Sequence, residues 1–433
     1  MVTDSRGFRP IHYLGNKLRH LEPIVSAVVD LTPPGRMVLD LFAGSGVVSR
    51  GLANYRPVFS VDVQAYSAVL ATALSHPCRY DHTERQRIIA TARQWLGHVR
   101  GGVSALLEYE SAVSQEASRN PQRFALLVEE GSTASLTATE PELAHAKATA
   151  LPILSDSGAT LTRYYGGVYF SYAQALELDA LIFAIGHSST SPANATLVAS
   201  VLGTASDLVA TVGSHFAQPS RLRDKAGLAK PGTVAQAIRA RERTAFAVFE
   251  QWLQRYADLE PVKYRCATIT SDFRTVLETL DDSVGAIYAD PPYTRDHYSR
   301  FYHVLETIAL ADDPGVTLAP GTSGPSRGLY RTQRHQSPFS IRTEVAEAFD
   351  AVFSAAHRRQ IPLVLSYSPQ GGGTTARPET RLMTIERIVK KAEEYFTSVD
   401  VRDIEDSSHS RFNRAELHGV LPANAEVLVV ARP

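Results

Sequence analysis

The sequence predicts an α/β protein with helices on both faces of a parallel sheet and a mainly helical segment inserted into the chain. Short apolar runs rich in β-branched residues alternate with amphipathic stretches near the N-terminus, and similar runs return after about residue 260. Residues 80–261 between them are polar, rich in Ala, Glu and Arg, and helical in pattern. One sheet interrupted by an insertion is the simplest arrangement that fits both observations.

The N-terminal part predicts a strand, a turn, a helix, a strand and a helix in that order. The strands are RMVLDLF (36–42) and VFSVDV (58–63), and the helices are VVSRGLANY (47–55) and AYSAVLATALSH (65–76). The small residues of AGSG (43–46) form the first turn.

The C-terminal part predicts the remaining strands of the same sheet. They are YRCATIT (264–270), VGAIYA (284–289), IPLVLSYS (361–368) and AEVLVVA (425–431). A helix is expected at YSRFYHVLETIAL (298–310), whose apolar residues repeat at helical spacing. Inside the insertion, GSTASLTATEPE (131–142) and GHSSTSPAN (186–194) are expected to be loops.

Composition indicates a folded, soluble chain of two or three domains. It has 433 residues, of which 44% are hydrophobic and 21% charged. The two cysteines cannot form a disulfide framework and have no metal-ligand spacing, so we expect a reducing compartment and no metal. With no apolar run long enough to span a membrane and no secretory signal at the N-terminus, a cytoplasmic location is expected.

The net charge of −1 excludes a uniformly basic surface, but two local segments are basic. Residues 221–243 carry seven Lys and Arg residues, including Arg221, Arg223 and Lys225. The segment SRGLYRTQRH (326–335) adds Arg327, Arg331, Arg334 and His335. Both are candidate phosphate-binding segments, and the alternative for each is a solvated helix face or loop.

The turn between the first strand and helix predicts a ligand site. Its small residues let a ligand approach the backbone, and the following helix offers free N–H groups. It lacks the third glycine of the dinucleotide fingerprint and the Lys-Ser/Thr of a phosphate-binding loop. Asp62 ends the second strand, where an acid accepts hydrogen bonds from ribose hydroxyls. A cofactor that contains ribose fits both features.

DLFAGSG (40–46) and DPPY (290–293) together resemble the cofactor loop and the catalytic tetrapeptide of DNA adenine-N6 methyltransferases related to Dam. The resemblance implies a Rossmann-like methyltransferase sheet, formed by residues 1–79 and 262–433, and S-adenosylmethionine as cofactor. It also implies that residues 80–261 form an inserted target-recognition domain. The cofactor residues that it implies are Tyr13, Lys17, Asp40, Phe42, Ala43, Gly44, Ser45, Gly46, Asp62, Asp272, Phe273 and Asp290.

Three shorter segments carry part of this resemblance. HYLGNKLRHLEPI (12–24) is similar to the segment that closes over the methionine end of the cofactor, although Gly15-Asn16 stands where Dam-like enzymes have two glycines. SDF (271–273) resembles the element that holds the adenine of the cofactor, with Asp272 at its amino group. LVLSYS, which ends at Ser368, is similar to the strand that supports the pocket for the target base.

The tetrapeptide suits methyl transfer to an exocyclic amino group, which is a poor nucleophile. Asp290 and the carbonyl of Pro291 can accept from the two N–H bonds, and Pro292 fixes the direction of that carbonyl. Tyr293 offers a ring on which a flipped base can stack. No covalent intermediate is required. Residues expected to contact the DNA next to the flipped base are Arg295, His297 and Arg300.

The function expected from these features is site-specific methylation of adenine N6 in double-stranded DNA. Marking of self DNA in restriction-modification or phage defence is the expected setting, and any restriction activity would need partner proteins because the chain has no nuclease or helicase motif. The alternatives are methylation of RNA or of cytosine N4 on the same fold, and a non-catalytic DNA-binding subunit.

Overall fold

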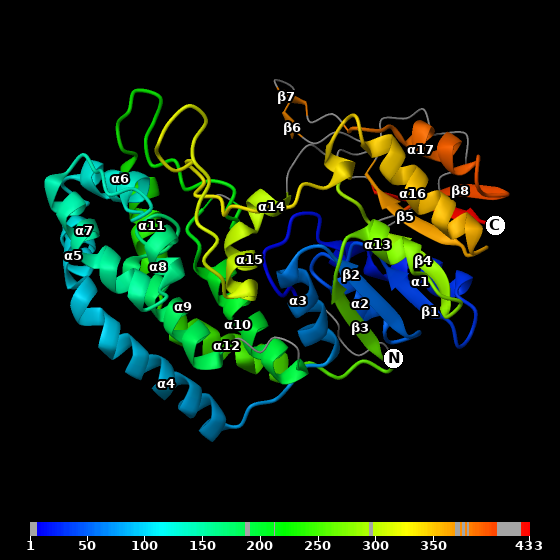
Figure 1. The fold of residues 1–433 in the computed structure, drawn as a ribbon, viewed down its shortest axis with the longest axis horizontal. Coiled ribbons are helices and arrows are strands. Elements are labelled where there is room, and N and C mark those ends of the chain that lie inside the picture. The colour runs from blue at the N-terminus through cyan, green and yellow to red at the C-terminus, as the bar shows by residue number, and fades with distance from the viewer. Residues whose placement is uncertain are drawn as a thin grey trace.

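A sheet of seven strands forms the right-hand part of the molecule in Figure 1. The computed structural model describes residues 7–186, 191–211, 213–293, 298–368, 373–374, 377–378, 381–404 and 426–433. The strand order is β3-β2-β1-β4-β5-β9-β8. The strands are β1 (Met37–Asp40), β2 (Val58–Asp62), β3 (Cys266–Thr270), β4 (Val284–Ala289), β5 (Leu363–Tyr367), β8 (Ser398–Asp403) and β9 (Val427–Arg432).

The strands β1 to β5 are parallel, as expected, but the last two strands are not. β9 runs antiparallel to both β5 and β8, so the expectation of one wholly parallel layer is wrong at this edge. The strand β8 was not expected, because SVDVRD lacks an apolar run and its side chains are only partly buried or exposed. Edge strands are solvated on one side and give this weak signal.

Helices cover both faces of the sheet, which confirms that part of the predicted fold. α1 (Leu21–Leu31) and α2 (Val47–Leu52) pack on the face that includes Val38 and Val364. α13 (Phe273–Glu278), α16 (Val345–Arg358) and α17 (Ile385–Ala392) pack on the face that includes Leu39 and Leu363. Neighbouring residues of a strand point to opposite faces, so a strand buried on both faces is apolar throughout.

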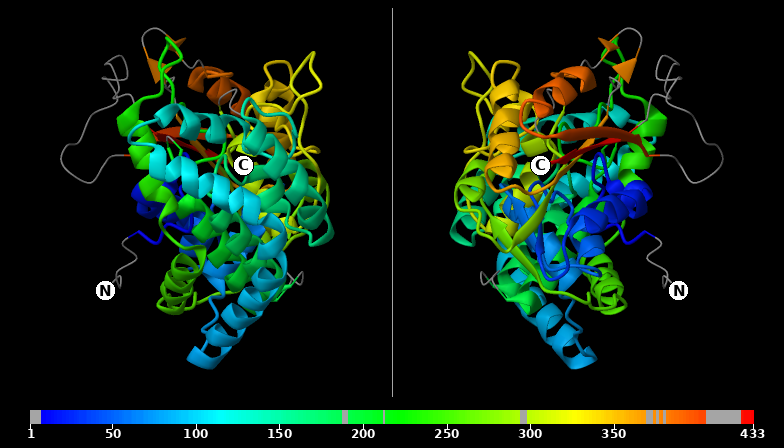
Figure 2. Two further views of the ribbon diagram at one scale, coloured as in Figure 1. Left: turned by 90° about the vertical axis from the view of Figure 1, so that its left-hand side faces the viewer. Right: turned by 90° about the vertical axis from the view of Figure 1, so that its right-hand side faces the viewer.

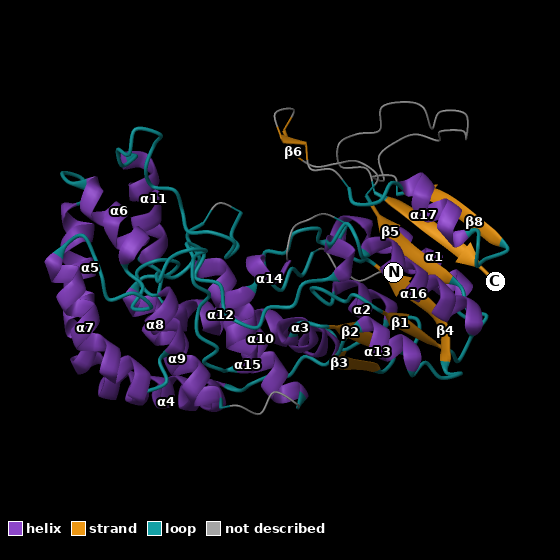
Figure 3. Cartoon of the chain, turned by 45° about the horizontal axis from the view of Figure 1, so that its top comes forward, coloured by secondary structure: helices purple, strands orange, loops and turns teal. Residues whose placement is uncertain are grey.

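The chain between α3 (Ala65–Ser75) and β3 is helical and extends away from the sheet (Figure 3). Figure 2 shows this helical part from its outer side and the sheet from the opposite side. Its helices are α4 (His82–Arg100), α5 (Ser104–Glu116), α6 (Pro121–Glu130), α7 (Pro141–Asp156), α8 (Thr160–Tyr165), α9 (Tyr172–Ile185), α10 (Pro192–Leu208), α11 (Pro231–Arg241) and α12 (Ala245–Ala257).

The helical part is joined by a continuous apolar core to α3, the helix that packs on β2 and β3. α10 is buried along nearly its whole length and packs against α3, α9, α12 and α15 (His303–Leu310). One cluster of buried side chains runs from Leu70 on α3 to Leu202 on α10 and Trp252 on α12. The division into domains at residues 80 and 261 stays a prediction.

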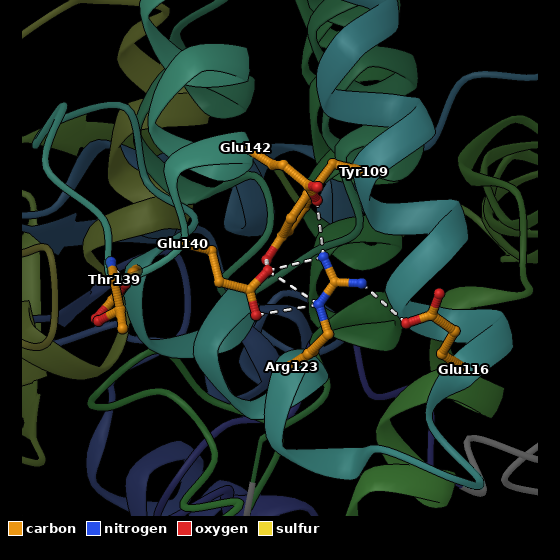
Figure 4. A network of polar contacts seen from close by, with 7 residues as sticks. Tyr109, Glu116, Arg123, Thr139, Glu140 and Glu142 are labelled. Carbon is orange, nitrogen blue, oxygen red and sulfur yellow. Dashed lines mark hydrogen bonds and ion pairs between the residues drawn. The ribbon is translucent and has the colours of Figure 1, made fainter.

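Farther from the sheet, an arginine links three helical segments (Figure 4). Arg123 on α6 donates hydrogen bonds to Glu116 at 2.9 Å, to Glu140 at 2.8 Å and to Glu142 at 2.9 Å. Tyr109 on α5 donates to Glu140 at 2.8 Å. The network fixes α5, α6 and the start of α7 relative to one another.

The predicted helix after the tetrapeptide is broken into α14 (Tyr298–Phe301) and α15. Tyr302 lies at the break, and its hydroxyl accepts a hydrogen bond from the backbone N–H of Leu14 at 2.7 Å. Its ring stacks on that of Tyr13 at a centroid distance of 5.0 Å. The break thus attaches the N-terminal segment to the chain that follows the tetrapeptide. In the described part of the chain, no helix is long and apolar enough to cross a membrane.

Candidate active site

One cavity of about 1090 Å³, including its open mouth, lies at the carboxyl ends of the parallel strands. It sits where the sheet order changes direction between β1 and β4, the usual ligand position in open α/β sheets. Most predicted cofactor and catalytic residues line it: Tyr13, Lys17, Asp40, Phe42, Ala43, Gly44, Ser45, Asp62, Asp272, Phe273, Asp290, Pro291, Pro292 and Tyr293.

The loop after β1 depends on glycine at two positions with left-handed backbone. Gly44 has φ of +53°, and a Cβ there would lie 2.7 Å from the hydroxyl of Tyr13. Gly46 has φ of +76°, and its Cβ would lie 2.6 Å from Cα of Ala71. Gly46 does not belong to the cavity lining. It lets α2 start close against α3, whereas Gly44 lets Tyr13 approach the loop.

Asp62 fixes the shape of this loop from the end of β2. Its carboxylate accepts hydrogen bonds from the backbone N–H groups of Gly44 at 2.8 Å and Gln64 at 2.9 Å. Burial raises the pKa of Asp62, and these two N–H groups oppose that shift. Since each carboxylate oxygen has a further lone pair, Asp62 can also accept from a ligand hydroxyl.

Asp40, at the end of β1, is fully buried below the loop. One oxygen of its carboxyl group accepts a hydrogen bond from the hydroxyl of Ser49 at 2.5 Å, and among the described residues the other makes no hydrogen bond of normal geometry. Burial raises its pKa to about 7, against the opposing effect of Ser49. A buried carboxyl oxygen at the cavity wall is an acceptor available to a ligand.

Phe42 and Phe273 form an apolar wall of the cavity, and a third ring, that of Phe339, packs against both of them. Phe42 and Phe273, both predicted, lie 5.6 Å apart between ring centroids. Phe339, which the sequence did not indicate, lies 5.2 Å from each of them. Asp272 caps α13 by accepting from the N–H of Arg274 at 2.9 Å, which fixes the direction of its carboxylate beside this wall.

Asp290 follows β4 directly and forms an ion pair with Lys17, 2.9 Å between Nζ and Oδ1. Lys17 also pairs with Glu426, which directly precedes β9. Burial raises the pKa of Asp290 to about 7, Lys17 opposes that shift, and the negative charge of Glu426 adds to it. A carboxylate with this pKa can accept a proton from a substrate near neutral pH.

Two cations lie near the ring of Tyr293, which lines the cavity. Nζ of Lys17 lies 5.6 Å and the guanidinium of Arg381 4.5 Å from its ring centroid. Arg381 donates to the carbonyl of Ser368 at 2.9 Å and to its hydroxyl at 2.8 Å. Tyr367 meets the ring of Tyr293 edge-on at 5.4 Å. The predicted Ser-Tyr strand end therefore lies beside the tetrapeptide.

The predicted DNA contacts differ in whether the structure describes them and whether they are exposed. Arg295 and His297 lie outside the described residues. Arg221, Lys225 and Arg300 are exposed. The guanidinium groups of Arg300 and Arg334 lie 5.7 Å and 4.9 Å from the ring centroid of Tyr330, so two cations share one aromatic ring.

Two predicted DNA contacts are instead engaged within the protein. Arg331 is 3% exposed and forms an ion pair with Asp312 at 2.7 Å. Arg223 forms an ion pair with Glu129 at 2.9 Å and also donates to Gln122. In this arrangement each guanidinium already has a carboxylate partner, and a role for either residue in DNA binding stays a prediction. The sequence showed only that the segments are basic.

Four site residues were not singled out as such by the sequence reasoning: Phe339, His335, Arg381 and Glu426. His335 was noted only as part of a basic segment, yet it lines the cavity. Burial lowers its pKa, against the opposing charges of Asp272 and Asp62. A position within the predicted strand 425–431 was the only signal for Glu426.

Comparison with known proteins matches one segment of this chain to a known family. Residues 228–361 match the family described as D12 class N6 adenine-specific DNA methyltransferase, a range that includes β3, β4, the tetrapeptide and α16. A stretch of 117 residues, 27% of this chain, is 31% identical to the Type II methyltransferase M.FokI of Planomicrobium okeanokoites. The match covers 16% of that protein. The predicted resemblance to D12 class N6 adenine-specific DNA methyltransferases is therefore confirmed over residues 228–361.

Proposed function

We propose that this protein methylates adenine N6 at a specific site in double-stranded DNA, with S-adenosylmethionine as methyl donor. The observation that carries the proposal is that a single cavity is lined both by the glycine loop and by the DPPY tetrapeptide. A methyl donor and an acceptor amine must meet in one place, and this cavity brings together the residues suited to each. The family match over the tetrapeptide supports adenine N6 as the acceptor.

The residues that line the cavity fit the proposed cofactor. Asp62 is placed for ribose hydroxyls, and Phe42 and Phe273 offer an apolar wall for a purine. The approach of Tyr13 to Gly44 closes the N-terminal segment over the loop. The buried oxygen of Asp40 that makes no hydrogen bond of normal geometry among the described residues gives a further acceptor. When bound, S-adenosylmethionine supplies a methyl group activated by its sulfonium.

Asp290 and Pro291 would hold the acceptor amine. The carboxylate of Asp290 and the carbonyl of Pro291 accept from its two N–H bonds, which turns the nitrogen lone pair toward the methyl carbon. Asp290 would stabilise the positive charge that develops on the nitrogen as it takes the methyl group from the sulfonium of the donor. The amine then loses one proton to Asp290, whose raised pKa suits it as the acceptor.

DNA would reach the cavity along its open mouth. Tyr298 and Ser299 line the cavity directly before Arg300, and His335 lines it directly after Arg334. Arg300 and Arg334 therefore lie at its rim, where two cations near one tyrosine ring suit a phosphate beside a flipped base. The helical part next to the mouth is the proposed reader of the recognition site.

The test is single-molecule sequencing of genomic DNA from a methylase-free bacterial host that expresses this protein or its Asp290→Ala variant. We expect N6-methyladenine at one short motif with the intact protein and none with the variant, because the variant lacks the acceptor for the amine. Equal methylation by both proteins would contradict the mechanism. If cytosine N4 or RNA is modified instead, the proposed substrate is wrong and that nucleic acid takes its place. If the protein binds the cofactor but modifies no nucleic acid, a non-catalytic subunit is favoured.

A restriction-modification system is the proposed setting. The relative from Planomicrobium okeanokoites is described as a Type II methyltransferase. In this setting, methylation of the site by this protein would protect the DNA, and partner proteins would supply DNA cleavage. Transformation of a host with the partner nuclease alone, compared with both genes together, would test this role: survival only with the methyltransferase is expected.

A further inference from the structure

Lys17 is held between two carboxylates, only one of which belongs to the tetrapeptide. It is 5% exposed and lies 2.9 Å from Oδ1 of Asp290, and it also contacts Oε1 of Glu426. Glu426 is 8% exposed and accepts a hydrogen bond from the hydroxyl of Ser366 at 3.3 Å. His20 lies 3.6 Å from its second oxygen. Glu426 is thus fixed by β5, β9 and the N-terminal segment.

The carboxylate of Asp290 has two roles that compete: it must accept from the substrate amine, and it neutralises Lys17. The proposed reaction needs the Asp290 carboxylate as an acceptor for the adenine amino group. A buried ammonium group needs a countercharge, and if Asp290 were the only one, Lys17 would occupy that acceptor and weaken it as a base. Because Glu426 supplies a second countercharge, Asp290 does not have to neutralise Lys17 alone.

We infer that Glu426 is a positioning residue that holds Lys17 and so keeps the carboxylate of Asp290 available to the acceptor amine. This inference rests on the proposed function, and it names a residue more than 130 positions from the tetrapeptide in the sequence. Glu426 touches neither substrate in this scheme. It acts on Asp290 through Lys17.

The charges around Asp290 determine the direction of the expected effect. The groups that face it or act on it are Lys17, Glu426, Asp40, Tyr288, Tyr293 and Tyr298. Loss of the Glu426 charge removes one contribution that raises the pKa of Asp290. It also leaves Lys17 paired with Asp290 alone, which lowers that pKa further.

The first experiment measures single-turnover methylation of the identified DNA site as a function of pH with the intact protein, Glu426→Gln and Glu426→Asp. Because Asp290 must be ionised, the rate should rise with pH and level off above its pKa. For Glu426→Gln we expect the methylation rate to rise at lower pH than in the intact protein. We also expect the maximal rate at high pH to fall by up to about a hundredfold. Glu426→Asp keeps the charge, so its methylation rate should rise at the same pH as in the intact protein, with part of the maximal rate recovered.

A structural role would give a different result. Glu110→Gln is the matched control, since Glu110 forms another buried ion pair, with Arg241 at 2.6 Å in the helical part. Glu110→Gln should lower the melting temperature without changing the pH at which the methylation rate rises. If Glu426→Gln behaves in the same way, scaling the rate equally at every pH, the inference is overturned, because Glu426 would then only stabilise the fold.

A binding measurement separates this inference from the proposed function. Lys17 with two ionised carboxylates leaves an excess negative charge, which favours the sulfonium of S-adenosylmethionine over the neutral thioether of S-adenosylhomocysteine. Calorimetric titration should show that this preference falls in Glu426→Gln and persists in Glu426→Asp. An unchanged preference would overturn the charge role of Glu426 even if the intact protein methylates DNA. A lost preference without methylation of any nucleic acid would overturn the proposed function and leave the Lys17–Glu426 pairing as a feature of cofactor binding alone.

Discussion

Gly46 and Gly158 have similar left-handed backbones but very different surroundings. Their φ angles are +76° and +68°. A Cβ at Gly46 would lie 2.6 Å from Cα of Ala71, which is backbone and cannot turn aside, whereas a Cβ at Gly158 would meet nothing within 4 Å. The two positions therefore separate the cost of an unfavourable φ from the cost of a clash.

We predict that Gly46→Ala destabilises the protein more than Gly158→Ala does. The unfavourable φ should cost each variant about 1–2 kcal/mol. Gly46→Ala should cost about 1–3 kcal/mol more, because α2 must move away from α3. Denaturant unfolding of both variants measures the difference. Equal destabilisation would mean that the packing of the loop on α3 is loose enough to absorb a methyl group.

The carboxyl group of Asp40 gives a prediction about pH. Its pKa in the folded protein is raised to about 7, so the folded state holds this proton more tightly than the unfolded chain does. Its contribution to stability is therefore greatest at low pH and is lost as pH rises through about 7. Asp40→Asn keeps an acceptor for Ser49 and cannot ionise.

For Asp40→Asn we expect a smaller decrease in the free energy of unfolding between acidic and slightly alkaline pH. The variant should be close to the intact protein in acid and relatively more stable above neutrality. Denaturant titrations at several pH values measure this. A pH dependence identical to that of the intact protein would show that Asp40 is not protonated in the folded state.

At the scale of single elements, the N-terminus of α8 is capped by a residue from another helix. Asp179 on α9 accepts from the backbone N–H groups of Leu161 at 2.9 Å and Thr162 at 2.8 Å, and from the hydroxyl of Thr162 at 2.7 Å. Asp179 is 5% exposed. The first turn of α8 thus depends on tertiary packing, since no side chain at its own N-cap satisfies these groups.

We predict that Asp179→Ala destabilises the helical part by about 1–3 kcal/mol, because buried N–H groups would be left without a partner. Asp224→Ala is the control. Asp224 also accepts from two backbone N–H groups, those of Ala226 and Leu228 at 2.9 Å each, but it is exposed. Water can replace it there, so little destabilisation is expected. Hydrogen exchange at α8 would locate the effect.

The elements also show what the sequence could predict and why the rest was missed. Apolar runs predicted β1, β2, β4 and β5, because strands buried on both faces are largely apolar. The edge strand β3 is only partly buried and was predicted from its β-branched Thr and Ile residues. β8 was missed because its exposed side chains carry no such pattern. The break at Tyr302 was missed because it is stabilised by a hydrogen bond with Leu14, far away in the chain.

In the site, too, residues within short motifs could be predicted, whereas residues brought together by the fold could not. Residues within contiguous motifs, such as Gly44 and Asp290, were found because a short stretch of sequence carries their spacing. Glu426 and Arg381 reach the tetrapeptide only through the order of strands in the sheet. Arg331 was assigned to the DNA because charge is visible in a sequence and its partner Asp312 is not.

At the scale of the whole molecule, the helical part shares one apolar core with α3, which packs on β2 and β3, so a substrate bound by both parts would meet a single framework. The basic residues of this framework fall into two groups. Arg221 and Lys225 are exposed, whereas Arg223, between them in the sequence, is paired with Glu129. Phosphate binding releases counterions from DNA and makes affinity depend on salt, but only cations free to reach phosphates contribute.

We predict that Arg221→Ala and Lys225→Ala each weaken DNA binding and reduce the slope of log affinity against log salt, by up to about 0.9 for each phosphate that the variant no longer neutralises. Arg223→Ala should leave that slope unchanged and lower stability, because it removes the ion pair with Glu129 and the hydrogen bond to Gln122. Fluorescence anisotropy of a labelled duplex at several salt concentrations, with melting temperatures for each variant, distinguishes the two effects. If Arg223→Ala changes the slope as much as its neighbours do, the ion pair must open on DNA and the guanidinium must turn to a phosphate. If none of the three changes it, this segment is a solvated surface and the DNA is bound by the rim around Arg300 and Arg334.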